Sequence, residues 1–315
     1  MIDIFMKTLP FFALIALGYQ AGRSGFFTAE ATAYLTKFVF YFALSAMLFR
    51  FAANLSLAEV LDWWFVAAYL TGCFAVYFLA MGVAFFRRRP ITEAAIEAQC
   101  AVIGNTGFLG VPMLIVLLGP AAAGPVLMVL SLDLIVFSSL VVILITGSRD
   151  GRMSFGIVKT VGMGLVKNPM IVSMVAGLAM SGAEIPLPNV ADEFLSILGA
   201  AATPGALFAI GASLAGKSAE RVSVAAWISF CKLVLHPLAV AFAALVLFPV
   251  PLFDAAVMIS AASLPVAGNV YMLAQHYGVA PQRVSASILI STALSILTVS
   301  LVIGWVSGVA GISLP

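Results

Sequence analysis

Ten apolar stretches, each long enough to cross a lipid bilayer, occupy most of this 315-residue chain. A transmembrane helix needs about 20 apolar residues, and charged residues or Gly and Pro separate these stretches. Such a chain folds as an all-α membrane protein, because backbone polar groups inside a bilayer must be satisfied within the protein. The expected helices cover residues 4–22, 31–52, 61–86, 95–118, 122–146, 168–183, 193–214, 222–248, 253–275 and 284–308.

The composition agrees with a membrane location. Hydrophobic residues make up 63% of the chain and charged residues 9%, whereas soluble domains are about a quarter charged. The spans leave no room for a soluble catalytic domain, and the basic residues form no continuous face for nucleic acid. Three cysteines lie in apolar stretches without metal-ligand spacing, and we interpret them as packing residues: Cys73, Cys100 and Cys231.

The second five stretches repeat the layout of the first five at an offset of 159 residues. Because each copy has an odd number of spans, the copies insert with opposite orientations, as in many secondary transporters. The alternative is that helices of similar composition match by accident. We expect a first five-helix repeat over 1–146, a cytoplasmic linker over 147–167 and an inverted second repeat over 168–315. The matches of rarer residues are Pro10 with Pro169, Gly18 with Gly177, Phe49 with Phe208, Met113 with Met272 and Gly119 with Gly278.

Lys and Arg are unevenly distributed between the two sides of the expected membrane. With the N-terminus outside, eleven fall in inside loops and two, Lys7 and Arg50, fall outside, which is the bias that sets topology. We therefore expect a multi-pass protein of the cell inner (plasma) membrane with both termini outside. The inside residues are Arg23, Arg87, Arg88, Arg89, Arg149, Arg152, Lys159, Lys167, Lys217, Arg221 and Arg283.

The fourth and ninth stretches contain sequences that a regular helix does not tolerate. The fourth reads Gly-Asn-Thr-Gly over 104–107, and the ninth reads Leu-Pro-Val-Ala-Gly-Asn over 264–269. Both should break at the same depth, and unwound backbone in a bilayer is tolerated only in protein or beside a wet cavity. We expect the breaks to cross, so that two half-helices start there with free N–H groups that favour an anion.

Polar side chains at these breaks are candidates for substrate contact. Asn105 and Thr106 sit where a half-helix cap belongs and can donate hydrogen bonds to a carboxylate. Asn269 lies one turn into the matching half-helix. The alternative is that Asn105 only caps its helix and Asn269 only joins two helices. The substrate-binding candidates are Gly104, Asn105, Thr106, Gly107, Pro265, Val266 and Asn269.

Ionisable residues inside apolar stretches are costly, and they mark either function or a buried pair. Asp133 lies midway along the fifth stretch, and Lys232 and His236 share one face of the eighth. We expect these three residues to couple transport to H⁺ or Na⁺. Alternatives are an interhelical hydrogen bond for Asp133, packing for His236, and pairing of Lys232 and His236 with Asp133 or with a bound dianion. Glu97 is expected at a solvated helix start.

The sequences at both breaks resemble motifs of the auxin efflux carrier family. Residues 104–112, Gly-Asn-Thr-Gly-Phe-Leu-Gly-Val-Pro, are similar to the fourth-span motif of the family, and residues 264–278 are similar to its ninth-span motif. The resemblance extends along nearly the whole chain. It implies ten transmembrane helices in two inverted five-helix repeats with broken, crossing helices four and nine, an NhaA-like or PIN-like arrangement. It also implies a scaffold bundle from spans 1, 2, 6 and 7, a transport bundle from spans 3–5 and 8–10, and often a homodimer.

The resemblance further implies transport of organic anions: auxin in plant members, and malonate or malate in bacterial members. This chain has Ser45 where many members of the family have proline, and it has Gly104 where the plant carriers have proline. These differences argue against auxin itself as the substrate.

We therefore predict a secondary active transporter of small dicarboxylates such as malonate or malate, working by alternating access. Alternatives are an exporter of lipophilic, auxin-like weak acids and an anion channel. The chain lacks a nucleophile–base motif and metal-ligand spacing, so we expect neither an enzyme nor a cofactor protein. The expected partners are the small organic anion, membrane lipids and a second copy of the chain.

Overall fold

The computed structural model describes residues 2–55, 62–150, 155–216 and 222–311, and their regular structure is helical apart from one β-bridge. Four of the expected spans contain a short π-helical or 3₁₀ turn, written η. The elements are α1 (Ile2–Arg23), α2 (Ala29–Phe38), η1 (Val39–Ala43), α3 (Leu44–Ala53), α5 (Trp63–Phe86), α6 (Ile91–Val102), η2 (Thr106–Gly110), α7 (Val111–Leu118), η3 (Pro120–Ala122), α8 (Ala123–Leu132), η4 (Asp133–Phe137), α9 (Ser138–Asp150), α10 (Phe155–Val166), α11 (Pro169–Gly182), α12 (Asn189–Ala200), α13 (Ala202–Ala215), α14 (Val222–Phe230), η5 (Cys231–Leu235), α15 (His236–Phe242), η6 (Ala243–Leu247), α16 (Leu252–Ala262), α17 (Gly268–Tyr277) and α18 (Pro281–Ala310).

Within the described residues, six helical segments are long and apolar enough to cross a bilayer. A seventh is obtained if α10 and α11, which meet at a 71° bend, count as one broken span. The chain is therefore an all-helical, multi-pass membrane protein. The full set of ten crossings remains a prediction. The six segments are Ala29–Ala53, Trp63–Phe86, Pro120–Arg149, Asn189–Ala215, Val222–Leu247 and Pro281–Ala310.

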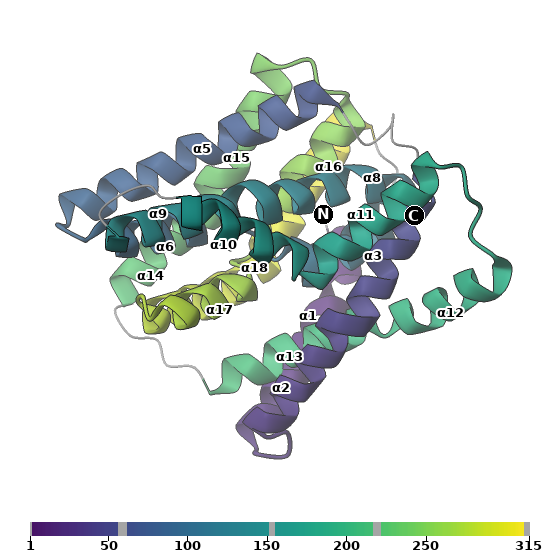
Figure 1. The fold of residues 1–315 in the computed structure, drawn as a ribbon, viewed down its shortest axis with the longest axis horizontal. Helices are drawn as coiled ribbons and strands as arrows, with labels where there is room; N and C mark the ends of the chain where they lie inside the picture. Colours follow the sequence, from purple (N-terminus) through teal and green to yellow (C-terminus); the bar gives the residue numbers. More distant parts are fainter. Residues whose placement is uncertain (1, 56–61, 151–154, 217–221, 312–315) are drawn as a thin grey trace.

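The helices fall into two closely packed sets. In one set α1 lies along α13 and α3 lies along α11, and in the other α5 lies along α6 and α14 along α18. Figure 1 shows the first set at the lower right and the second set at the upper left. The seam between the two sets is where the broken helices lie.

Small residues allow the helices of the first set to touch backbone to backbone. A Cβ atom at Gly18 of α1 would lie 2.1 Å from the carbonyl oxygen of Phe208 on α13. A Cβ atom at Gly177 of α11 would lie 2.6 Å from the carbonyl oxygen of Phe49 on α3. Close approach at glycine is how helices associate in membranes, where apolar burial between helices gives no advantage over lipid.

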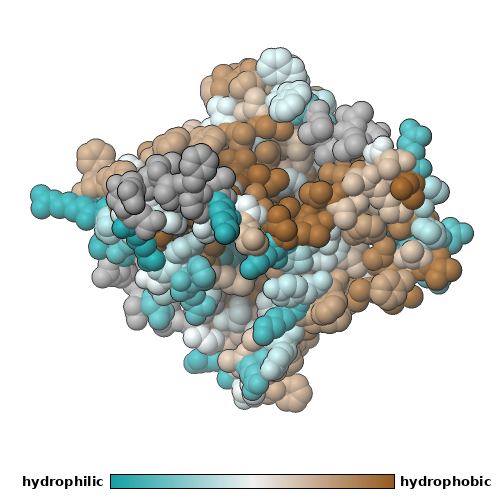
Figure 2. Space-filling view, viewed as in Figure 1, coloured by the Kyte–Doolittle hydropathy of each residue, from teal (hydrophilic) through white to brown (hydrophobic). Residues whose placement is uncertain are grey.

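The surface is mostly apolar, as a bilayer requires. Figure 2 shows hydrophobic side chains over much of one face, with hydrophilic side chains gathered at the left edge, where α5 ends and α6 begins. On α12, Val190, Phe194 and Ile197 are exposed along one side of the helix at 82%, 62% and 71%. Large apolar side chains so exposed face lipid in a spanning protein.

The structure corrects the expected linker over 147–167. Helix α9 continues to Asp150, and residues 155–166 form helix α10 instead of a loop. Val161 and Leu165 lie four residues apart and line a cavity, so this helix has an interior side despite its glycines. Residues 151–154 of the linker lie outside the described residues, as do Arg152, Lys217 and Arg221 of the charge count.

Glu97 is also corrected, because it is not at a solvated helix start. It is 1% exposed, and its carboxylate accepts hydrogen bonds from Arg283 of α18 at 2.5 Å and from Arg87 at the end of α5. Arg283 also contacts Glu93 at 3.0 Å. A buried carboxylate is tolerated when it is paired in this way, and the network ties the ends of α5, α6 and α18 together.

Replacing Gly18 by valine should destabilise the protein, because the new side chain would overlap the backbone of α13 at Phe208. Overpacking costs about 1–3 kcal/mol, and we expect a lower unfolding temperature in detergent, followed by intrinsic tryptophan fluorescence. Gly308→Val is the matched control, since a Cβ atom there meets no atom within 4 Å. Equal unfolding temperatures for the two variants would contradict the backbone contact.

Candidate functional site

The two helix breaks meet and satisfy each other's backbone groups. Helix α6 ends at Val102 and α16 ends at Ala262, and the extended residues after them form an antiparallel bridge between Gly104 and Val266. The Asn105 N–H donates to the Pro265 carbonyl at 2.8 Å, and the Ala267 N–H donates to the Ile103 carbonyl at 3.1 Å. The expectation that the breaks cross is therefore confirmed by direct hydrogen bonds.

A new helix starts on each side of this crossing. Thr106 begins η2, which continues into α7, and Gly268 begins α17. Neither start has a side-chain cap among the described residues, so first-turn N–H groups remain available there. Asn105 occupies the cap position but forms no capping hydrogen bond. Asn269 lies in the first turn of α17, and its Oδ1 atom is buried without a hydrogen-bond partner.

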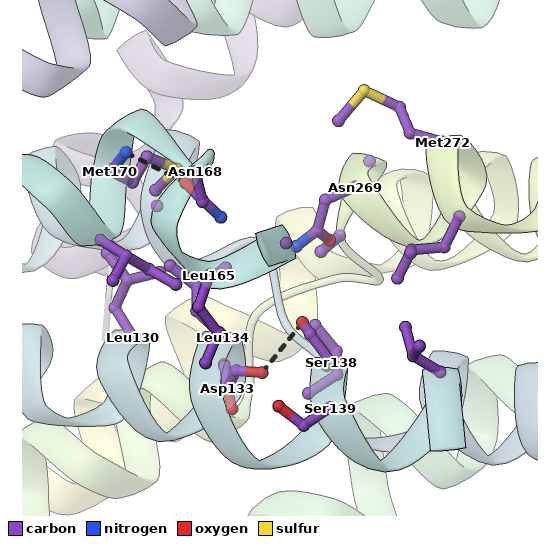
Figure 3. Close-up of a pocket in the computed structure, with 18 of the residues that line it drawn as sticks. Leu130, Asp133, Leu134, Ser138, Ser139, Leu165, Asn168, Met170, Asn269 and Met272 are labelled. Atoms are coloured by element: carbon purple, nitrogen blue, oxygen red, sulfur yellow. Dashed lines mark hydrogen bonds between the residues drawn. The ribbon is translucent and has the colours of Figure 1, made fainter. Parts of the chain in front are cut away.

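A cavity of about 640 Å³ extends from the crossing along α9, α10 and α17. In Figure 3, Asn269, Asn168 and Asp133 approach it from α17, from the turn between α10 and α11, and from η4. Apolar residues form most of the remaining wall, including Phe40, Phe108, Leu130 and Leu134. Its polar and charged lining residues are Asn105, Asp133, Ser138, Ser139, Thr160, Lys167, Asn168, Asn269, His276 and Tyr277.

The structure divides the residues singled out from the sequence into two groups. Gly104, Asn105, Gly107, Asn269 and Asp133 line the cavity. The others lie behind it, within the packed helices: Thr106, Pro265, Val266, Lys232 and His236 are buried and do not line it. Pro265 and Val266 form the far side of the crossing, where the Val266 N–H donates to the Ser291 hydroxyl at 3.1 Å.

Asp133 connects the cavity to the crossing. Its carboxylate accepts a hydrogen bond from the Tyr69 hydroxyl at 2.7 Å and one from the Thr106 hydroxyl at 3.3 Å. The Thr106 hydroxyl lies 3.5 Å from the Gly104 carbonyl oxygen as well. Ser138, one π-turn further along, donates to the Asp133 backbone carbonyl at 3.3 Å. Asp133 forms no ion pair among the described residues, so the alternative in which Lys232 or His236 pairs with it is wrong.

Lys232 and His236 are fully buried on the opposite side of the crossing. The Lys232 ammonium donates to the Ala262 carbonyl at 2.5 Å and lies 3.0 Å from His236 Nδ1. His236 Nδ1 also lies 3.1 Å from the Ala262 carbonyl oxygen, and Nε2 lies 3.1 Å from Cys73 Sγ. Ala262 is the last residue of α16, whose free carbonyl groups carry partial negative charge, and Lys232 therefore stabilises the end of a half-helix.

The cavity lining includes residues that were not predicted as site residues from the sequence, among them Lys167, Asn168 and His276. Lys167 and Asn168 lie where the expected linker meets the sixth span, and the Asn168 side chain caps α11 through the Met170 N–H at 3.0 Å. His276 follows Asn269 by seven residues on α17, which places both on one helix face. The seven-residue spacing could have predicted His276 from the sequence. Lys167 could not be predicted in this way, because it lines the cavity only if residues 155–166 form a helix in the cavity wall.

The site therefore combines an apolar cavity, unpartnered amide groups and two helix starts. Such a mixture suits a small organic molecule with an anionic group, which the amides and N–H groups can orient. Within the described part of the chain, His, Cys, Asp and Glu form no group of three that could hold a metal ion.

Comparisons with known proteins identify membrane transporters as relatives of this chain. Residues 3–303 match the family described as "Membrane transport protein". The chain is 31% identical over 306 residues to the "Putative malonate transporter" of Rhizobium meliloti (strain 1021), covering 95% of each protein. It is 25% identical over 291 residues to the "Uncharacterized transporter YfdV" of Escherichia coli (strain K12), covering 90% of this chain and 91% of that protein. It is also 27% identical over 227 residues to the "Lysosomal cholesterol signaling protein" of Mus musculus, covering 68% of this chain and 26% of that protein.

Replacing Lys232 by methionine should destabilise the protein, because the Ala262 carbonyl at the end of α16 would lose the buried ammonium group that donates to it. A buried group left without its partner costs about 1–3 kcal/mol, and the expected readout is a lower unfolding temperature in detergent. Lys37→Met is the matched control, since Lys37 is exposed on α2. If both variants unfold at the wild-type temperature, Lys232 does not support the crossing.

Proposed function

Because the chain belongs to the membrane transport protein family, which is the auxin efflux carrier family that its motifs resemble, we propose that it is a secondary active transporter of small organic anions. The favoured substrates are dicarboxylates such as malonate or malate, held at the crossing and moved by alternating access. The family match covers nearly the whole chain, so the proposal concerns this protein as a carrier and not as an enzyme.

The main support for this proposal is that, within the described part of the chain, the side-chain amides of Asn105 and Asn269 lack hydrogen-bond partners where the helix breaks meet the cavity. Asn105 forms no side-chain hydrogen bond among the described residues, and Asn269 Oδ1 is buried without a partner. Native structures rarely leave buried polar groups unsatisfied, so these side chains are the candidates for contact with a solute. The Nδ2 groups of Asn105 and Asn269 and the first-turn N–H groups of η2 and α17 can donate hydrogen bonds to a carboxylate, while Asn269 Oδ1 can accept one from a hydroxyl or a water molecule.

The substrate class is supported by the charge and size of the cavity. Lys167 and His276 supply positive or titratable donors toward its mouth, and the volume of about 640 Å³ lies within the range of small-molecule sites. The R. meliloti relative, named for malonate, is similar over 95% of its length. A second candidate substrate class, the lipophilic auxin-like weak acids, is favoured by the stacked rings of Phe40 and Phe108, which line the cavity at a centroid separation of 6.3 Å.

Two inverted repeats of five spans, over 1–146 and 168–315, are part of the proposal. The offset of 159 relates Gly18 to Gly177 and Phe49 to Phe208, and the close contacts are Gly18 with Phe208 and Gly177 with Phe49. In one contact the glycine belongs to the first half and the phenylalanine to the second, and in the other contact the assignment is reversed. A two-fold relation between the halves would produce this reciprocity, which supports two inverted repeats over an accidental similarity of composition.

Alternating access would use the two sets of helices described above. We propose that α1–α3 and α11–α13 form the scaffold and that the set containing both breaks moves against it, carrying the substrate. The protein would lie in the inner (plasma) membrane with both termini outside, as the Lys and Arg distribution favours, and would form a homodimer. Asp133, Lys232 and His236 are the candidates for coupling to H⁺ or Na⁺.

An anion channel could use the same cavity, but its flux would not saturate with substrate concentration as that of a carrier does. Uptake of labelled malonate into proteoliposomes should saturate with concentration and should respond to a proton or sodium gradient. Flux that is linear in concentration and indifferent to both gradients would favour a channel.

Asn105→Ala should reduce malonate uptake while the protein still inserts and folds. The loss of an amide hydrogen bond to a charged group is worth about 1.5–3 kcal/mol, so we expect the apparent affinity to fall by roughly tenfold or more. Asn54→Ala is the matched control, because among the described residues the Asn54 amide donates to the Arg50 carbonyl at an exposed helix end, away from the cavity. Wild-type uptake by the Asn105 variant would remove Asn105 from the site.

A further inference from the structure

We propose that Asp133 binds one proton for each anion held at the crossing, and that protonation exposes the bound anion to the charge of Lys232. The inference rests on the proposed function, since it concerns the coupling of anion transport at that same cavity. It assigns separate roles to residues that the sequence grouped together: Asp133 takes the proton, and Lys232 is a positioning residue that acts through the backbone.

Asp133 is placed to exchange protons with the cavity while being held by protein on its other sides. It is 2% exposed and lines the cavity. Tyr69 and Cys73 of α5 face it from one side and Thr106 of η2 from another. Lys232 of η5 lies beyond the backbone of Gly104 and forms no ion pair with Asp133 among the described residues. On the cavity side, the other titratable groups are Lys167, His276 and Tyr277.

The hydrogen bonds around Asp133 suit both of its protonation states. With the carboxylate ionised, the Tyr69 hydroxyl donates to Oδ1 and the Thr106 hydroxyl donates to Oδ2. With a proton on Oδ2, that O–H can donate to Thr106 Oγ1, and the Thr106 hydroxyl can turn to the Gly104 carbonyl 3.5 Å away. A hydroxyl donates once and accepts as well, so the Asp133 carboxyl group and the Thr106 hydroxyl keep partners in both states.

Lys232 lies directly beneath the backbone that lines the cavity. A Cβ atom at Gly104 would be 3.2 Å from Lys232 Nζ and 3.3 Å from the Ala261 carbonyl oxygen. Gly104 itself lines the cavity, so one residue of backbone separates the ammonium group from the proposed anion. The ammonium is held there by the Ala262 carbonyl and by His236.

The sign of the coupling follows from these charges. With Asp133 ionised, its negative charge offsets Lys232, and it also repels an anion in the same cavity. When one proton from the cavity water forms an O–H bond on Asp133, the net charge beside the crossing becomes +1, and electrostatic interactions there are strong because the site is buried. Proton and anion therefore bind together, cross together and are released together, which is symport.

The test is malonate binding to the purified full-length protein in detergent, at neutral to mildly alkaline pH, where both malonate carboxyls are ionised. For the wild type, we expect the dissociation constant to rise by up to about tenfold per pH unit, as the linkage of one proton requires. Asp133→Asn should bind malonate with no pH dependence. Asp254→Asn is the matched control, because Asp254 is a half-buried acid at the start of α16 outside the cavity, and it should keep the wild-type slope.

A second measurement covers the case in which Asp133→Asn fails to fold. Mixing wild-type protein with malonate in weakly buffered solution at mildly alkaline pH should remove about one proton per bound anion, detected with a pH-sensitive dye. Binding without proton uptake, or an unchanged pH slope in a folded Asp133→Asn variant, would overturn the proton site and leave the carrier proposal intact. If neither malonate nor malate binds the wild type, the proposed substrate class fails and the coupling fails with it.

Discussion

The structure depends on one constraint: backbone groups removed from a helix inside a bilayer must find other partners. At the crossing they find each other, since the N–H of Asn105 bonds to Pro265 and the N–H of Ala267 bonds to Ile103. Pro265 has no N–H to satisfy, which makes it suited to a position whose carbonyl alone is used. This exchange allows two helices to stop in mid-membrane without stranded donors, and it leaves the new helix starts free for a solute.

The ends of the interrupted helices create a second requirement, which is charge balance. The carbonyl end of α16 is matched by Lys232, and the start of η2 at Thr106 is matched by Asp133. A helix start favours a negative group and a helix end favours a positive one. Both ions are far from bulk water, so the removal of either would leave the other poorly compensated. Lys232 and Asp133, which neutralise the partial charges at the ends of the broken helices, are therefore also close enough to interact electrostatically with a charged ligand.

Sequence patterns predicted much of this arrangement for physical reasons that can be stated. Gly104, Gly107 and Pro265 marked the breaks because helices do not tolerate such runs, and Asn105, Asn269 and Asp133 stood out as polar groups in apolar surroundings. The sequence did not show which helix faces which. Glu97 therefore passed as a solvated residue although Arg283, 186 positions away, covers it. Lys167 was counted only as an inside charge, because residues 147–167 were expected to be a linker and α10 forms there instead.

The π-turn η4 has a consequence for how the chain tolerates length changes. Its five residues, from Asp133 to Phe137, form a π-turn, which holds one residue more than the corresponding α-helical turn. The additional residue is absorbed within the turn, so the residues beyond it keep the orientation that a regular helix one residue shorter would give them. Deleting one residue here would let the segment relax into an unbroken α-helix with Ser138 and Ser139 still facing the cavity, whereas the same deletion in a regular turn would rotate them by about 100°. The fifth span should therefore tolerate the loss of one residue in this turn better than anywhere else along its length.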